Sequence, residues 1–226
     1  MTFLVSHHGT SRSIYNTSSF VSEYGIDAYS PLFEAVRFSS AEYPKGGVPS
    51  GRRTASLEQS LHDSIRASRK TLREPCYVYG FSAGGQYLSR VAAFFPCRWV
   101  TRYVIGAPST WVWPDSRAAP FGFGNTYKTS QEMDVAIAAY LQLPLTVFCG
   151  TADNDPNGAD LDRSAEAMRQ GSHRLERAQN VYAAAQRTAA TKGVKLNWSY
   201  VAAPGIGHSG TSLLNSRERN AAFGPA

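Results

Sequence analysis

The chain has 226 residues, of which 42% are hydrophobic, 12% are aromatic and 18% are charged. This composition is sufficient for a buried core and excludes a disordered or low-complexity protein. No apolar run reaches the roughly 20 residues of a membrane-spanning helix, which argues against an integral membrane protein. Lys and Arg outnumber Asp and Glu by 23 to 17, a net charge of +6. Because these basic residues are scattered, we interpret them as a solvated surface rather than as a nucleic-acid site.

The three cysteines, Cys76, Cys97 and Cys149, are odd in number and widely spaced, which indicates neither a disulfide framework nor a zinc site. Since two of them lie in apolar runs, we interpret them as buried free thiols. Free thiols fit a reducing compartment, and no charged leader with a cleavage site follows Met1. We therefore expect a cytoplasmic protein. A secreted protein whose leader had been removed would give the same sequence.

Short apolar runs alternate with longer segments of helical spacing. In chain order, we predict strands at 2–6 and 26–33, a loop at 43–53, a helix at 56–72, a strand at 76–81, a helix at 84–95, a strand at 99–105, an irregular segment at 108–129, a helix at 131–141, a strand at 143–149, helical residues at 160–192 broken near Gly171, a strand at 196–202, and a short terminal helix. This alternation predicts an α/β fold with a mainly parallel sheet of about six strands and helices on both faces. No repeat or linker divides the chain, so we expect one domain over 1–226.

The strongest motif is Gly80-Phe81-Ser82-Ala83-Gly84-Gly85, between a predicted strand and a predicted helix. This is the G-x-S-x-G pattern of a nucleophile elbow, in which a sharp turn holds an exposed serine in a strained conformation. A Cβ at Gly80 or Gly84 would crowd such a turn. A Gly/Ser-rich turn can also be only a tight turn or a phosphate-binding loop. The motif therefore indicates a catalytic serine only if the sequence also supplies the acid and the histidine that such a serine requires.

The partners of an elbow serine are an acid and then a histidine, each after the carboxyl end of a later strand. Asp153 follows the strand at 143–149, and His208 follows the strand at 196–202. Asp155 lies two residues beyond Asp153 and could reach the same space. The stretch 153–158 also matches the start of a calcium loop, but Ser164 stands where such a loop needs Glu. We therefore predict no metal site.

At these residues the sequence resembles the α/β-hydrolase superfamily. Within it, His8-Gly9, the elbow, Gly150-Thr151-Ala152-Asp153 and Gly205-Ile206-Gly207-His208 look like bacterial serine esterases of the polyhydroxybutyrate-depolymerase-like group. The resemblance favours Asp153 over Asp155, because Asp153 occupies the Gly-x-x-Asp position. It implies a reduced sheet, since members usually have two further strands before the His-Gly strand. It also implies hydroxyalkanoate oligomers and similar polyesters as substrates.

A mechanism follows from this set of residues. Ser82 attacks the carbonyl and forms an acyl-enzyme, His208 accepts and returns the proton, and Asp153 fixes the imidazole tautomer. The oxyanion needs two donors, one of which should be the backbone N–H of Ala83. By resemblance the other is Thr10, with Gly9 as the alternative. The mechanism implies no cofactor.

The segment at 108–129 is rich in aromatic residues and lies where this fold inserts caps. Trp111 and Trp113 could bind substrate as walls of an acyl or aromatic pocket, or they could anchor an ordinary loop to the core. His7, His62 and His173 are interpreted as surface or structural histidines, and His8 as packing support for the oxyanion loop.

We therefore predict a serine hydrolase that cleaves small or oligomeric carboxylic esters, without nucleic acid as a partner. A thioesterase or an amidase would use the same three residues. An inactive scaffold that binds a ligand or a partner is a further alternative. The sequence leaves the oligomeric state open.

Overall fold

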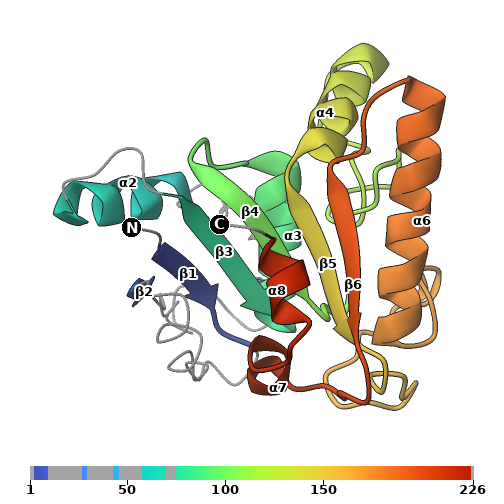
Figure 1. Cartoon of the computed structure of the whole chain (residues 1–226). Helices are drawn as coiled ribbons and strands as arrows, with labels where there is room; N and C mark the ends of the chain where they lie inside the picture. The colour runs from blue at the N-terminus through green and yellow to red at the C-terminus, as the bar shows by residue number, and fades with distance from the viewer. Residues whose placement is uncertain (1–2, 10–26, 30–42, 46–57, 70–74, 225–226) are drawn as a thin grey trace.

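The computed structural model describes residues 3–9, 27–29, 43–45, 58–69 and 75–224. Within them, parallel strands form one six-stranded sheet in the order β2-β1-β3-β4-β5-β6. The strands are β1 (Phe3–His7), β2 (Asp27–Tyr29), β3 (Cys76–Phe81), β4 (Val100–Gly106), β5 (Leu145–Gly150) and β6 (Trp198–Ala203). Their carboxyl ends point to one edge of the sheet (Figure 1). The predicted α/β fold with about six parallel strands is confirmed.

Helices cover both faces of this sheet. The helical elements are η1 (Tyr43–Lys45), α2 (Glu58–Arg69), α3 (Ala83–Phe94), α4 (Ser130–Gln142), α5 (Ala165–Met168), α6 (Arg174–Lys192), α7 (Gly210–Leu214) and α8 (Arg219–Phe223). Helix α3 packs on β3 and β4, while α6 packs on β5 and β6. Figure 1 shows α8 on the face of the sheet opposite α3.

The central strands of the sheet are apolar because helices cover both of their faces. Every residue of β3 and β5 is buried, as expected for parallel strands between two helical layers. Helix α3 is nearly as deep, since Phe94 is its only residue that is not buried. An element this enclosed is a rigid support for the residues at its N-terminus.

Several predicted boundaries differ from the structure. Of the predicted strand at 26–33, the structure describes Asp27–Tyr29, which form a strand. Three other parts of the predictions lie outside the described residues: the rest of that strand, 46–53 of the predicted loop, and both ends of the predicted helix at 56–72. The prediction of helix from residue 160 is wrong. The first helical piece starts only at Ala165, where Ser164 accepts a capping hydrogen bond from Ala167 N. The predicted break near Gly171 is confirmed, and α6 begins after the N-cap residue His173.

The segment between β4 and α4 is irregular, as predicted, and it closes on itself. Backbone hydrogen bonds run from Trp113 N to Phe121 O (2.8 Å), from Phe123 N to Asp115 O (2.9 Å) and from Gly124 N to Arg117 O (2.7 Å). Beyond it, Thr129 and Glu132 form a reciprocal capping box that starts α4. This loop is therefore held in part by its own backbone hydrogen bonds.

The cysteines match their prediction, because all three are buried and free. Among the described residues, no helix has both the length and the apolar character needed to cross a membrane.

Candidate active site

The predicted elbow joins β3 to α3. Ser82 has φ 56° and ψ −118° and directly precedes the first residue of α3. A positive φ is strained for a residue with a side chain, which confirms the predicted strain. Two hydrogen bonds hold the turn: Ser82 N donates to Gly106 O, and Gln86 N donates to Ser82 O, both at 2.9 Å. The Ser82 side chain is therefore fixed above the carboxyl end of β3.

The two glycines of the motif are required by close backbone contacts, as predicted. A Cβ on Gly80 would lie 2.4 Å from the carbonyl oxygen of Gly84. A Cβ on Gly84 would lie 2.6 Å from the oxygen of His8 and 2.7 Å from that of His7. The start of α3 therefore touches the end of β1 through backbone atoms.

The structure brings Ser82, His208 and Asp153 into one line of hydrogen bonds. His208 Nδ1 lies 2.7 Å from Asp153 Oδ2, and His208 Nε2 lies 3.1 Å from Ser82 Oγ. A carboxylate only accepts, so Nδ1 carries the proton and Nε2 is left to accept from the serine hydroxyl. Ser82 and Asp153 are buried, whereas the His208 side chain is 29% exposed. The geometry is that of a serine whose proton can pass to a partly solvated imidazole.

The loops after β5 and β6 are tied together, which explains why residues 55 positions apart meet. Ala152 N donates to Ile206 O at 3.0 Å, and Leu175 N in the first turn of α6 donates to Asp153 O at 3.0 Å. Asp155, the alternative acid, instead accepts a hydrogen bond from Asn157 N at 2.8 Å. The structure therefore places Asp153, rather than Asp155, beside His208.

Sequence analysis missed two neighbours of this line. The Phe81 ring lies under the His208 imidazole, with 4.5 Å between ring centroids. The buried Arg174 places Nη1 3.9 Å from Asp153 Oδ1. Burial lowers the pKa of Arg174, although the Asp153 charge opposes this. Phe81 was visible as the second residue of the elbow motif, but Arg174 lies on α6 and had no local signal.

The predicted oxyanion donors are only partly described. Ala83 is the first residue of α3, so its N–H has no acceptor within the helix. Thr10 lies outside the described residues.

The structure places the predicted substrate-binding indoles of Trp111 and Trp113 in the core. Trp111 is 0% exposed and Trp113 is 8% exposed. Gln170 accepts from Trp111 N and donates to Trp111 O, both at 2.9 Å, and the Arg117 guanidinium lies 3.9 Å from the centre of a Trp113 ring. This arrangement corresponds to the alternative interpretation, a loop anchored to the core.

The described ranges were predicted to contain no metal site. They hold no group of three or more His, Cys, Asp or Glu side chains arranged to bind an ion.

No protein-family profile matches the sequence, and no curated protein matches it. Two solved structures at 25% or higher identity have similar folds over 97% of this chain. The poly(3-hydroxybutyrate) depolymerase LpqC from Bordetella parapertussis has 25% identity and a TM-score of 0.86 over 78% of its own chain. Poly(aspartic acid) hydrolase-1 from Sphingomonas sp. KT-1 has 27% identity and a TM-score of 0.82 over 87% of its chain. An S-formylglutathione hydrolase from Agrobacterium tumefaciens, 11% identical over 97% of this chain and 82% of its own, shares the fold at a TM-score of 0.55.

The fold and the similarity to the first two of these structures define the chain as an α/β-hydrolase. Within that superfamily it resembles the polyhydroxybutyrate-depolymerase-like group, as the sequence motifs predicted.

Proposed function

We propose that this hydrolase cleaves carboxylic esters through an acyl-enzyme on Ser82. The observation that carries the proposal is the line from Ser82 Oγ through His208 to Asp153, with spacings of 3.1 Å and 2.7 Å. Both separations are hydrogen-bond distances, which a nucleophile and its base require. The strained, positive-φ serine between a strand and a helix is the second support.

The chemistry divides into two halves. In acylation, Ser82 Oγ attacks the ester carbonyl as its proton passes to His208 Nε2, and the imidazolium then protonates the departing alcohol. In deacylation, His208 takes a proton from water as the water oxygen attacks the acyl carbonyl, and the imidazolium then returns that proton to Ser82 Oγ as the acid leaves. Asp153 stabilises the imidazolium in both halves. The Ala83 N–H, and Thr10 by our sequence prediction, would donate to the oxyanion.

The proposed substrates are esters of hydroxy acids and their oligomers. This class is suggested by the similarity to a poly(3-hydroxybutyrate) depolymerase. A second candidate is an amide of the poly(aspartic acid) type, suggested by the similar identity to a hydrolase of that polymer. Both reactions would use the same nucleophile, so the two candidates are distinguished by comparing the turnover of ester and amide substrates.

The test is hydrolysis of a short-chain p-nitrophenyl ester by wild type and by Ser82→Ala. Ser64→Ala is a matched control, because Ser64 is an exposed helix serine whose hydroxyl donates to Ser60 O in the same helix. We expect turnover in wild type and in the control, and loss of about 10⁴-fold or more in Ser82→Ala. Unchanged turnover in Ser82→Ala would refute the proposed nucleophile.

A panel of acyl-matched ester, thioester and amide substrates then decides the bond class. Oligomers of 3-hydroxybutyrate and of aspartate complete the panel. Preference for the amide and the aspartate oligomers would overturn the ester proposal in favour of the second candidate.

A further inference from the structure

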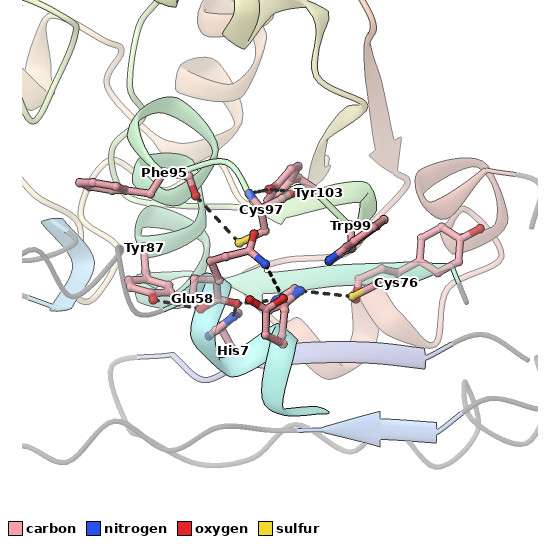
Figure 2. Close-up of polar contacts among 12 residues, drawn as sticks. His7, Glu58, Cys76, Tyr87, Phe95, Cys97, Trp99 and Tyr103 are labelled. Carbon is pink, nitrogen blue, oxygen red and sulfur yellow. Dashed lines mark hydrogen bonds and ion pairs between the residues drawn. The ribbon is translucent and has the colours of Figure 1, made fainter. Parts of the chain in front are cut away.

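A second group of titratable side chains surrounds Glu58 of α2 (Figure 2). The Glu58 carboxylate is fully buried. Its Oε1 lies 2.9 Å from His7 Nε2 and 2.9 Å from His62 Nε2, and its Oε2 accepts from the Tyr87 hydroxyl at 3.0 Å. Sequence analysis did not identify Glu58, and it interpreted His7 and His62 as surface or structural; both are buried.

Glu58 is ionised in this environment. Burial alone would raise the pKa of the Glu58 carboxyl, but the electrostatic interaction with His7 and the hydrogen bonds from His62 and His7 outweigh burial and hold that pKa well below its usual range. A carboxylate has no proton to give, so both imidazoles donate Nε2–H to it. A buried charge with three donors is a strong and directional anchor.

The cluster is not a second nucleophilic site. Cys76 Sγ lies 3.6 Å from His62 Nδ1, which places a thiol, an imidazole and a carboxylate in sequence. Cys76 is 0% exposed, however, and burial raises the pKa of its thiol far above the usual range. A reactive thiol needs a stabilised thiolate and access to substrate, and Cys76 has neither.

The contacts of Glu58 instead connect β1 and α3, two elements that touch beside the elbow. His7 is the last residue of β1, and Tyr87 lies in the second turn of α3. These same elements touch where Gly84 faces the carbonyl oxygens of His7 and His8. His62 is different, because it lies on α2 itself, four residues from Glu58.

Further contacts extend this link to the residue after His7. The Tyr43 ring stacks on Tyr87 at 5.1 Å and on His8 at 4.6 Å between centroids. The Tyr43 hydroxyl donates to His8 O at 3.1 Å. The chain that leaves β1 toward Gly9 is therefore also held through Tyr43, which contacts Tyr87 of α3.

We propose that Glu58 is a positioning residue, which holds the end of β1 against α3 through His7 and Tyr87 and so fixes the backbone at His8 and Gly9 relative to Ser82 and the oxyanion donor Ala83 N–H. This inference rests on the proposed function, because it assigns Glu58 to the transition state of that reaction. Glu58 acts through backbone position and touches no reacting atom. Its loss should therefore weaken binding of the oxyanion more than binding of the substrate.

The experiment compares two histidines that make the same bond. His7→Asn and His62→Asn each remove a buried 2.9 Å contact to Glu58 Oε1, but only His7 belongs to β1. His7→Gln is the rescue variant, because a glutamine amide can place an N–H near the former Nε2. For each variant we would measure kcat, KM, the inhibition constant of an alkylboronic acid and the melting temperature, with assays well below the lowest melting temperature.

We expect His7→Asn to lower kcat by about 30-fold with little change in KM, because a small displacement of oxyanion donors acts on the transition state. The boronate, whose adduct with Ser82 resembles that state, should weaken by a similar factor. His7→Gln should recover most of kcat. His62→Asn should keep kcat within about threefold of wild type at a comparable loss of stability.

Equal losses of kcat in His7→Asn and His62→Asn, or unchanged boronate inhibition in His7→Asn, would overturn the inference. If His7→Asn does not fold, Tyr87→Phe decides in its place, because it removes only the hydroxyl that α3 donates to Glu58. Failure of the proposed function is distinguishable, since wild type would then be inactive on esters or Ser82→Ala would remain active.

Discussion

The contact between Gly84 and β1 allows a sharp test of the elbow geometry. In Gly84→Ala, the new Cβ would lie 2.6 Å from His8 O, whereas ordinary van der Waals contact begins at 3.4 Å. The neighbouring atoms are backbone, so β1 and α3 must separate by about 0.8 Å. A displacement of about 1 Å among groups that bind the transition state can reduce the rate by about 10²-fold.

The effect on stability should be smaller. Alanine is favoured over glycine in a helix by about 1 kcal/mol, which offsets part of the roughly 1–3 kcal/mol that overpacking costs. We therefore expect Gly84→Ala to lose about 50-fold or more in kcat/KM while its free energy of unfolding falls by at most about 2 kcal/mol. Ester hydrolysis and urea unfolding measure the two quantities.

Gly207→Ala is the matched control, because it also adds a Cβ next to a catalytic residue, His208. Apart from its two chain neighbours, the atom nearest to that Cβ would be Ala152 O, at 3.9 Å, so no atom has to move. Its kcat/KM should remain within about threefold of wild type. If Gly84→Ala also stays within about threefold, the end of β1 does not constrain the reacting geometry, and the reasoning is refuted.

Two further predictions concern carboxylates. Asp153→Asn should reduce kcat by about 10⁴-fold, because the asparagine amide would donate to His208 Nδ1 and leave the imidazole proton on Nε2. Asp155→Asn should leave kcat nearly unchanged. If ester hydrolysis instead fails in Asp155→Asn and persists in Asp153→Asn, the acid is Asp155. Glu58→Gln should lose about 3 kcal/mol of unfolding free energy near neutral pH. The folded pKa of Glu58 is lowered, so this contribution is complete above about pH 4.3, where an unfolded glutamate titrates, and it declines in more acidic solution. Urea unfolding from neutral to acid pH measures it, and a difference between wild type and Glu58→Gln that does not shrink in acid would contradict the ionised state.

The sequence was most informative where chemistry is encoded locally. The elbow residues are contiguous, and Asp153 and His208 each follow an apolar strand, so parallel topology alone brings them to one edge of the sheet. The strain at Ser82 follows from the elbow motif itself. These features require no knowledge of side-chain packing.

The features that sequence analysis missed depend on tertiary packing. Glu58 lies in a helix whose sequence is largely polar, and nothing local distinguishes a carboxylate facing water from one that faces two histidines. Trp111 and Trp113 lie in an irregular segment without periodicity, so substrate contact and core anchoring could not be separated. Arg174 reaches Asp153 only because α6 starts beside the loop after β5.

The self-closed loop between β4 and α4 gives the molecule a site for architectural change. Its backbone bonds end at Gly124, and α4 begins independently with the capping box at Thr129. Asn125, Thr126 and Lys128, between these two fixed points, are exposed. Residues inserted there would lengthen the connection into solvent without altering the register of any strand. The same scaffold could therefore acquire a covering domain at this point while the elbow and its partners keep their positions.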